Sequence, residues 1–470
     1  MNANRGTVGT ALAEALPEGT VATDPATLDA HAHDDAEWAD FGRPAAVVFA
    51  TSTEDVVATV QVAATHNTSV VPRGAGTGLS GGANATHGCI VLSLEGMKQI
   101  IEVNAAERFA VAQAGVLNDD LRRHVAKYEL WYPPDPASQS ISTIGGNVAT
   151  NAGGICCVKY GVTRDYVLGL TVVLADGRVA KLGRSTAKGV TGYDLTGLFV
   201  GSEGTLGIVT EVTVKLRPLG GREERGVIGY FASLSDAGDA VAAVTAAGLV
   251  PSALELIDAF SLHTVAQWQG WTMPDNANAL LLAKTDDPGP TGASAAARIA
   301  EIFTAAGAAE VQRADNDADV DRLFAARRLA YPALERLGPA LTEDVCVPRS
   351  QVPEMLRRIE AIAAENAVQI ANIAHAGDGN LHPLIVVPDR DPDAKDRAKL
   401  AFDAIVEACR ALGGTVTGEH GVGLLKLDGA AAELSPTVLD LHAAIKHALD
   451  PNNLLNPGKA FPPAPGKEAQ

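Results

Sequence analysis

Residues 70–82 read VVPRGAGTGLSGG and place five glycines within nine residues, directly after a short β-branched run. The spacing Gly76-x-Gly78-x-x-Gly81 matches the dinucleotide fingerprint, but that fingerprint should open a helix. The residues that follow, GGANATHGCIVLSL, are too rich in glycine and β-branched side chains for a helix. We therefore predict a loop from strand to strand whose backbone N–H groups close around a diphosphate. A tight glycine turn without a ligand is the alternative.

The residues before this loop predict a β-α-β unit. Residues 44–74 read PAAVVFATSTEDVVATVQVAATHNTSVVPRG. Ser52 and Thr53 precede an acidic first turn, and apolar residues then recur at helical spacing. The two flanking Val-rich runs complete the unit as strands.

The pattern of predicted strands and helices changes near residue 220. Short Val-, Ile- and Leu-rich runs separated by glycine loops lie at 89–94, 167–182 and 207–216, which predicts a sheet-rich α+β domain. From about Gly220 onward, strands alternate with Ala-rich helical segments. We therefore predict a domain boundary between residues 219 and 220.

The composition narrows the class of protein. The chain has 470 residues and a net charge of −19 at pH 7, which repels phosphate backbones and anionic lipid. No apolar run reaches the ~18 residues that a membrane span requires. The five cysteines are odd in number and contain no C-x-x-C, so neither a disulfide framework nor an iron–sulfur cluster is encoded. Because the N-terminus lacks a signal pattern, we expect a cytoplasmic protein. Because of the negative net charge, we expect no binding to nucleic acid.

Two further glycine-rich motifs point to a large cofactor. Residues 133–154 read PPDPASQSISTIGGNVATNAGG and set hydroxyl and amide side chains among glycines, between predicted strands. Residues 201–216 read GSEGTLGIVTEVTVKL and place three glycines before a β-branched strand. Glycines allow close approach to a flat ligand, and the polar groups predict that it forms many hydrogen bonds.

Four chemistry-bearing residues lie in glycine turns near the C-terminal end. IANIAHAGDGNLHPLIVV places His375 and His382 seven residues apart, and GGTVTGEHGVGLLK carries Glu419 and His420. Seven residues across a glycine turn can bring both imidazoles to one point. Two histidines and one carboxylate form the open three-ligand set of a catalytic divalent ion. Each histidine taken alone is more often a structural residue than a ligand, but the grouping of these residues in glycine turns favours ligands.

Two adjacent arginines are candidates to bind a carboxylate. RLFAARRLAYPALERLGP holds Arg327 and Arg328 in a helical stretch, and only a guanidinium offers a planar fork to a carboxylate. A solvated helix face is the alternative for both residues. Arg349, in VCVPRSQVP, is a weaker candidate.

In this order and combination, the motifs resemble the flavin-binding domain of the vanillyl-alcohol oxidase superfamily, the PCMH-type FAD fold. With the C-terminal motifs, the chain resembles the branch of D-lactate dehydrogenases, glycolate oxidase FAD subunits and D-2-hydroxyglutarate dehydrogenases, from about residue 40 to 460. The resemblance implies an α+β PCMH-type FAD-binding domain followed by an α/β substrate (cap) domain. The expected parts are an N-terminal segment (1–40), the FAD-binding domain (41–219), the substrate and metal domain (220–425), a segment returning to the flavin (426–462) and a flexible tail (463–470).

The resemblance also implies which residues hold FAD: the first loop wraps the pyrophosphate, and the other motifs hold the remainder. Residues 73–83 contain neither histidine nor cysteine, which favours non-covalent FAD, although His87, Cys156 and Cys157 lie near the loops. The expected cofactor residues are Arg73, Gly74, Gly76, Thr77, Gly78, Leu79, Ser80, Gly81, Pro134, Asp135, Ser138, Ser142, Thr143, Gly145, Gly146, Asn147, Thr150, Asn151, Gly153, Gly154, Tyr160, Gly161, Glu203, Gly204, Gly207, Ile208 and Asn456.

The same resemblance assigns catalytic roles. His375, His382 and Glu419 are implied to bind a divalent metal, with Zn²⁺ or Mn²⁺ favoured by the ligand types. His420 is implied to be the base that removes the substrate hydroxyl proton, and Arg327 to bind the carboxylate beside His375, His382 and His420. Oxidation of a 2-hydroxy acid needs this proton removed while a hydride leaves Cα.

The expected activity is metal-assisted, FAD-dependent oxidation of a small D-2-hydroxy acid, such as D-lactate or glycolate. Thr342 and Leu384 stand where the 2-hydroxyglutarate enzymes carry further polar residues, so a monocarboxylate is favoured over a diacid. The alternatives are a D-2-hydroxyglutarate dehydrogenase, an enzyme like the redox-neutral alkyl-glycerone-phosphate synthases, and a non-catalytic flavoprotein subunit. Because no cluster, haem or membrane motif is encoded, the electron acceptor is expected to be an external quinone, cytochrome or electron-transfer flavoprotein. A homodimer is an open possibility for the assembly.

Overall fold

The computed structural model describes residues 3–186, 188–387 and 393–462. The chain divides into two compact units. The first unit takes the residues up to 153, those from 162 to 220 and those from 419 onward, and the second takes 154–161 and 221–418. Residues 463–470, predicted as a flexible tail, lie outside the described residues.

The first unit contains a four-stranded sheet in the order β1-β2-β4-β3. Strands β2, β4 and β3 are parallel, and β1 joins β2 antiparallel. The predicted β-α-β unit is confirmed as β2, helix α3 and β3, with β4 inserted between the strands. The bounds are β1 (Val21–Ala22), β2 (Ala46–Phe49), α3 (Thr53–His66), β3 (Val70–Arg73) and β4 (Ile90–Ser93).

Helix α3 begins and packs as its sequence indicates. Ser52 Oγ accepts the Asp55 N–H (3.1 Å), and Asp55 Oδ2 accepts the Ser52 N–H (3.2 Å), which is a reciprocal cap. Val56 and Val60, one helical turn apart, are fully buried in the apolar cluster that includes Ile90 of β4. The glycine loop after β3 leads to β4 with no helix between them, as predicted.

A second sheet of the first unit has five antiparallel strands in the order β5-β6-β10-β8-β9. These strands confirm the runs predicted at 167–182 and 207–216. The bounds are β5 (Ile100–Asn104), β6 (Phe109–Gln113), β8 (Val167–Val173), β9 (Val179–Gly183) and β10 (Ile208–Lys215), with a separate pair of β7 (Leu130–Trp131) and β11 (Arg217–Pro218).

The remaining helices of the first unit flank these sheets. The bounds are α1 (Ala3–Ala15), α2 (Pro25–Ala30), α4 (Asn118–Ala126), α5 (Ile144–Thr150), the 3-10 helix η1 (Thr163–Tyr166), α7 (Leu195–Phe199), α15 (Leu427–Glu433) and α16 (Pro436–Leu449).

The second unit is built on an eight-stranded antiparallel sheet, in the order β15-β12-β14-β13-β18-β19-β16 with β17 also paired to β19. Its strands are β12 (Arg225–Phe231), β13 (Ala253–Asp258), β14 (Ala279–Thr285), β15 (Glu310–Ala314), β16 (Ala340–Thr342), β17 (Val345–Cys346), β18 (Gln369–His375) and β19 (Asn380–Val386). Its helices are α6 (Cys157–Tyr160), α8 (Leu234–Ala246), α9 (Ala259–Gln269), α10 (Gly289–Ala305), α11 (Asp317–Leu323), α12 (Ala325–Glu335), the 3-10 helix η2 (Arg349–Gln351), α13 (Val352–Glu365) and α14 (Ala394–Ala411).

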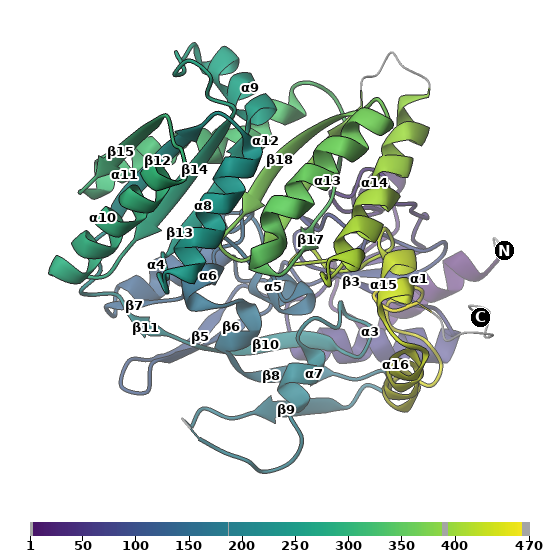
Figure 1. Ribbon diagram of the computed structural model, residues 1–470. Coiled ribbons are helices and arrows are strands. Elements are labelled where there is room, and N and C mark those ends of the chain that lie inside the picture. The colour runs from purple at the N-terminus through teal and green to yellow at the C-terminus, as the bar shows by residue number, and fades with distance from the viewer. Residues whose placement is uncertain (1–2, 187, 388–392, 463–470) are drawn as a thin grey trace. The chain divides into compact units, whose positions relative to one another are not determined.

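Helices cover both faces of this sheet. Figure 1 shows α8, α10, α13 and α14 lying along one face. Helices α9, α11 and α12 share an apolar cluster with Ile257 of β13, Ile373 of β18 and Leu384 of β19, so they cover the other. Side chains alternate between the faces of a strand. Glu255, His375 and His382 are therefore placed on the face that α12 covers.

The unit boundaries differ from the predicted domains at two places. Residues 154–161, predicted within the FAD-binding domain, belong to the second unit. There the fully buried Asp286 carboxylate accepts hydrogen bonds from the Tyr160 hydroxyl, Lys159 Nζ (2.6 Å) and Arg222 Nε (3.0 Å). Residues 419–425, predicted in the substrate domain, belong to the first unit. Contacts distant in sequence cause both shifts.

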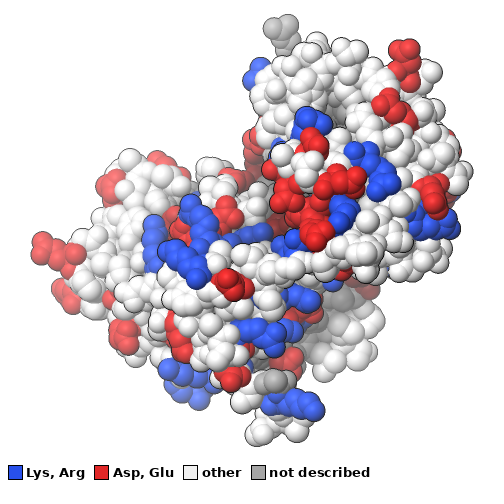
Figure 2. Space-filling view, turned by 90° about the vertical axis from the view of Figure 1, so that its left-hand side faces the viewer, with Lys and Arg blue, Asp and Glu red and all other residues white. Residues whose placement is uncertain are grey.

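Charged side chains of both signs share the surface. Figure 2 shows Lys and Arg interspersed with Asp and Glu on the face that it draws, so no single sign dominates there. No helix among the described residues is long and apolar enough to cross a membrane.

Candidate active site

The first unit contains a cavity that all three glycine-rich motifs line. It encloses about 1400 Å³ of empty space, its open mouth included. Most of the predicted cofactor residues line it: Arg73, Gly74, Gly76, Thr77, Gly78, Leu79, Ser80, Ser138, Ser142, Thr143, Gly145, Gly146, Asn147, Thr150, Gly153, Glu203, Gly204, Gly207 and Ile208. The fold of one unit thus brings motifs that lie more than a hundred residues apart in the sequence to one cavity.

The first glycine loop presents bare backbone to this cavity. Its start is anchored because Arg73 Nη1 donates to His33 O (2.7 Å). Gly76 has a φ of 77°, which L side chains rarely adopt, and a Cβ there would lie 2.0 Å from Arg73 Nη2, so a side chain would be strained and would displace the guanidinium. No described residue accepts a hydrogen bond from the backbone N–H groups of residues 76–80. Those amides are therefore available to a phosphate.

The second glycine motif contains a helix that its composition did not predict. Helix α5 (Ile144–Thr150) is capped by Thr143, whose Oγ1 accepts the Gly146 N–H (3.2 Å). A Cβ on Gly145 would lie 2.9 Å from Ala114 O, so the glycine lets the helix pack closely. Packing and the cap outweigh the low helix propensity of two glycines.

Eight predicted cofactor residues do not line the cavity: Gly81, Pro134, Asp135, Asn151, Gly154, Tyr160, Gly161 and Asn456. Asn456 lies behind it, where its Nδ2 donates to Gly82 O (2.9 Å) and Glu203 O (2.8 Å). Asn151 ends α5 in a left-handed conformation, and its Oδ1 accepts the Arg164 N–H (2.9 Å). Residues 154, 160 and 161 belong to the second unit.

Glu419 and His420 also line this cavity. His420 Nε2 lies 3.9 Å from Glu419 Oε1. A Cβ on Gly153 would come within 2.4 Å of Glu419 Oε2, so the end of the second glycine motif makes room for this carboxylate. The predicted base and the predicted cofactor loops therefore share one cavity.

The second unit brings His375 and His382 together on the β18–β19 hairpin. The register pairs His375 with Asn380 and Ile373 with His382, so the two histidines are diagonal neighbours across the strands. Their ring centroids are 5.1 Å apart and the rings are nearly perpendicular, at 86°. Both side chains are buried. The proximity that the seven-residue spacing predicted is present.

Glu255, which the sequence analysis did not single out, joins Arg327 to His375. Strand β13 pairs with β18 through Leu256 opposite Ala374, and the same register sets Glu255 opposite His375. Arg327 Nε donates to Glu255 Oε2 (2.7 Å), and His375 Nδ1 lies 2.9 Å from Oε1. Burial raises the pKa of Glu255, but the charges and hydrogen bonds of His375 and Arg327 outweigh it and lower the pKa overall.

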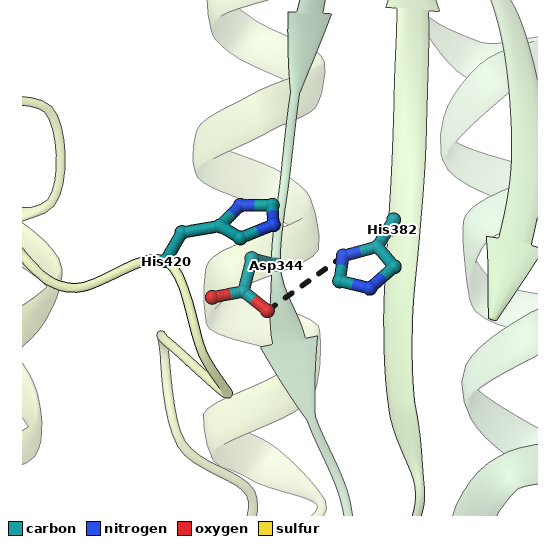
Figure 3. A group of neighbouring side chains, drawn as sticks. All are labelled: Asp344, His382 and His420. Carbon is teal, nitrogen blue, oxygen red and sulfur yellow. Dashed lines mark ion pairs between the residues drawn. The ribbon is translucent and has the colours of Figure 1, made fainter. Parts of the chain in front are cut away.

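Asp344 has the corresponding place beside His382. Its Oδ1 lies 3.7 Å from His382 Nδ1 (Figure 3). The same carboxylate accepts Asn380 Nδ2 (2.8 Å), Thr417 Oγ1 (2.8 Å) and the Gly418 N–H (3.0 Å). Asp344 thus fixes both the start of β19 and the segment that ends the second unit.

The arginine candidates separate by burial. Arg327, on α12, is buried, whereas Arg328 is exposed and pairs with Asp321 at 3.5 Å. Arg349 is exposed as well. Because Glu255 takes Arg327 Nε, the two terminal nitrogens of Arg327 remain for other partners. The solvated-face alternative therefore applies to Arg328 and not to Arg327.

One pattern in the sequence could have identified the missed acids. Glu255 interrupts the apolar strand run ALELID, and Asp344 follows Glu343 between two strands that pair with β19. A carboxylate at an inward strand position must find a cation or donors when it is buried. Their partners could not be read from the chain, because they lie far away in sequence.

Glu419 and His420 belong to the first unit, and His375, His382 and Arg327 to the second. Their predicted cooperation in one metal and substrate site therefore stays a prediction.

Comparison with known proteins supplies relatives along nearly the whole chain. Residues 44–183 match an FAD binding domain, and residues 222–460 match the C-terminal domain of FAD linked oxidases. The chain is 42% identical over 419 residues to glycolate oxidase subunit GlcD of Bacillus subtilis, covering 89% of each chain. It is 36% identical over 439 residues to D-lactate dehydrogenase of Anaerostipes hadrus, covering 91% of each. The fold resembles that of p-cresol methylhydroxylase with substrate bound, with a TM-score of 0.81, 17% identity and coverage of 100% and 99%.

Proposed function

Because the chain belongs to the family of FAD-linked oxidases, we propose that it oxidises a small D-2-hydroxy acid or glycolate to the 2-oxo acid. The predicted fold class, an FAD-binding domain followed by a second α/β domain, is confirmed by the two matched domains. One observation carries the proposal: the cavity lined by the three glycine motifs is also lined by Glu419 and His420. Relatives named as a glycolate oxidase subunit and a D-lactate dehydrogenase suit this substrate class.

The cavity fits FAD held without a covalent bond. The free N–H groups of residues 76–80 suit the pyrophosphate, as does the absence of a Cβ from the loop glycines. Among the described residues that line the cavity, His420 is the one histidine, and none is a cysteine. His87, Cys156 and Cys157 lie elsewhere. Acid precipitation should release intact FAD into the supernatant, and flavin retained in the pellet would contradict non-covalent binding.

The residues of this chain supply the binding and the proton transfer. When bound, FAD accepts a hydride from the substrate Cα, and a divalent cation lowers the pKa of the substrate hydroxyl. His420, at the cavity, takes the hydroxyl proton on an imidazole nitrogen. Arg327 binds the substrate carboxylate through its two terminal nitrogens, because Glu255 holds its Nε. Glu255 thereby fixes the direction of the guanidinium fork.

The histidines of the second unit suit a divalent metal. A carboxylate only accepts hydrogen bonds, so Glu255 favours the His375 tautomer with its proton on Nδ1, in which Nε2 is the ligand atom. His382 lies beside it, with Asp344 near its Nδ1. Two imidazoles with a carboxylate favour Zn²⁺ or Mn²⁺. Glu419 remains the proposed third ligand because of its place in the sequence motif.

A monocarboxylic substrate is favoured over a diacid. Thr342 and Leu384 are paired opposite each other in β16 and β19, and Leu384 is buried in the apolar cluster. Neither side chain offers a cation for a second carboxylate. We find no observation of this chain that favours an enzyme like the alkyl-glycerone-phosphate synthases or a non-catalytic flavoprotein subunit.

An anaerobic flavin-bleaching screen tests the proposal. The purified holoprotein would be mixed without oxygen with D-lactate, L-lactate, glycolate and D-2-hydroxyglutarate. Loss of the flavin absorbance with D-lactate or glycolate is the expected result. Bleaching by D-2-hydroxyglutarate alone would replace the proposed substrate, and no bleaching by any acid would remove the proposed activity.

Electrons are proposed to leave to an external acceptor other than oxygen. The chain carries no motif for an iron–sulfur cluster or haem. Substrate-dependent reduction of an artificial dye should therefore be fast, and peroxide formation in air slow. Oxygen uptake equal to the dye rate would instead indicate an oxidase.

A further inference from the structure

Glu203, in the third glycine motif, has a backbone conformation that is rare for a residue with a side chain. Its φ is 51°, in the left-handed region. The Glu203 N–H donates to Ala149 O (2.8 Å), and Asn456 Nδ2 donates to Glu203 O (2.8 Å). Strain of this kind persists only where its surroundings hold it in place. These two bonds therefore fix the direction in which the Glu203 side chain leaves the backbone.

The Glu203 carboxylate accepts two consecutive backbone amides. The Val422 N–H donates to Oε1 (2.7 Å), and the Gly423 N–H donates to Oε2 (2.9 Å). Only Gly421 lies between His420 and Val422. Glu203 is 8% exposed, so little water competes for these bonds. Hydrogen bonds to a carboxylate are stronger than those between neutral groups.

Ser80, in the first glycine motif, holds the same segment by other atoms. Its Oγ donates to Gly421 O (2.9 Å), and its carbonyl oxygen accepts the Leu424 N–H (2.7 Å). The segment after His420 is thus bonded to two of the three motifs that line the cavity.

The two glycines of this segment are required by these contacts. Gly421 has a φ of 86°, and a Cβ there would lie 2.9 Å from Glu203 Oε1. Gly423 has a φ of 51°, and a Cβ there would lie 2.0 Å from Ser80 O. In the sequence EHGVG, Gly421 and Gly423 are therefore the positions at which the segment lies too close to Glu203 and Ser80 for a side chain.

A buried lysine balances the charge of this anchor. Lys459 Nζ donates to Gly82 O (3.2 Å) and to Asn84 O, beside the first glycine loop. Burial raises the pKa of Glu203 to about 7, although the Val422 and Gly423 amides and the Lys459 charge act against it. The Lys459 charge therefore favours the ionised form of the Glu203 side chain.

We propose that Glu203 is a positioning residue, which anchors the segment carrying Glu419 and His420 to the cofactor loops through the Val422 and Gly423 amides. Its carboxylate serves the protein backbone rather than the cofactor. The inference rests on the proposed function only in taking His420 as the base.

The variant Glu203→Gln tests this role in the holoprotein. Glutamine keeps the size of the side chain, but its NH₂ group cannot accept an amide N–H. The FAD-to-protein ratio should stay at the wild-type value, and KM should change less than about threefold. The rate of flavin reduction at saturating acid should fall about 10²-fold, as for other misplacements of a catalytic group. Glu211→Gln is the matched control, because Glu211 on β10 accepts Thr171 Oγ1 (2.7 Å) and does not line the cavity.

Amide hydrogen exchange gives a readout independent of turnover. In Glu203→Gln, the Val422 and Gly423 amides should exchange at least about tenfold faster than in the wild type, and in Glu211→Gln they should not change. Unchanged exchange in Glu203→Gln, or loss of FAD from that variant, would overturn the proposal. If that variant does not fold, the wild type decides: unprotected Val422 and Gly423 amides would overturn it. Failure of the bleaching screen would leave these exchange results intact.

Discussion

Replacing Glu255 by glutamine should destabilise the protein through two buried partners at once. The Glu255 side chain is 1% exposed, and that of Arg327 is 11% exposed. Glutamine keeps one carbonyl acceptor for Arg327 Nε or His375 Nδ1 but removes the negative charge between them. The guanidinium is then left as a buried cation without its counter-ion.

The size of the effect follows from the geometry. Breaking a buried ion pair by removing one partner typically costs about 3–5 kcal/mol, and the remaining neutral acceptor offsets part of that loss. We expect a loss of about 2–4 kcal/mol in the free energy of unfolding. For a unit of about 200 residues, this corresponds to roughly 5–15 °C in Tm.

Thermal unfolding followed by calorimetry at pH 7 is the assay. Glu354→Gln is the control, because Glu354 also meets two arginines, Arg357 (2.9 Å) and Arg358 (3.0 Å), on an exposed helix face. Surface pairs contribute little, so this variant should melt like the wild type. An unchanged Tm for Glu255→Gln, together with an unchanged KM, would refute the buried network.

The pH dependence of the Glu255→Gln effect has a definite sign. The pKa of Glu255 is lowered in the folded protein. The stability it contributes is therefore present above its unfolded pKa and is lost as the pH falls through the folded value. The difference in Tm between wild type and Glu255→Gln should shrink in acid, and a difference that grows below pH 4.5 would contradict this sign.

The remaining predictions concern the proposed chemistry and one further carboxylate. His420→Ala should keep FAD yet slow anaerobic flavin reduction at least ~10²-fold, and a near-normal rate would move the base elsewhere. Arg327→Lys should raise KM by losing the planar fork, whereas exposed Arg328→Lys should leave it unchanged; equal effects would return both to a solvated role. Dialysis against a chelator should abolish turnover while the flavin spectrum persists, and full activity of metal-free protein would exclude a metal. Burial raises the pKa of Glu203 from 4.5 to about 7, so the stability it contributes is present below pH 4.5 and lost as the pH rises through 7. In chemical denaturation of the apoprotein, wild type should lose up to about 3 kcal/mol relative to Glu203→Gln between pH 4.5 and pH 8; parallel curves would contradict this.

Much of the cofactor cavity could be predicted because its signals are local. The glycines of residues 74–82 exclude a helix by their own conformational freedom, and the acidic first turn after Ser52 marks the start of α3. The seven-residue spacing of His375 and His382 spans one hairpin, so chain connectivity alone brings the rings together. Such features can be predicted because they depend only on residues that are close together in the sequence.

Features that depend on packing could not be predicted. The two glycines of α5 do not predict a helix, and only the fold shows that Gly145 packs closely against Ala114. Residues 154–161 lie in the second unit, where Lys159 and Tyr160 donate to Asp286, and no local pattern shows this contact. Asn456 Nδ2 donates to Gly82 O and Glu203 O, contacts that no local pattern shows. In each case, the deciding contact is distant along the chain.

The residue types of the proposed chemistry can be read from the sequence alone: glycine loops, paired histidines, an arginine and a Glu-His pair. Tertiary structure alone decided how the second unit orients the two histidines and the arginine. Glu255 lies 72 residues from Arg327 and 120 from His375, and only the register of β13 with β18 and the packing of α12 join them. A buried carboxylate must find partners wherever the fold supplies them, and no spacing along the chain specifies which ones.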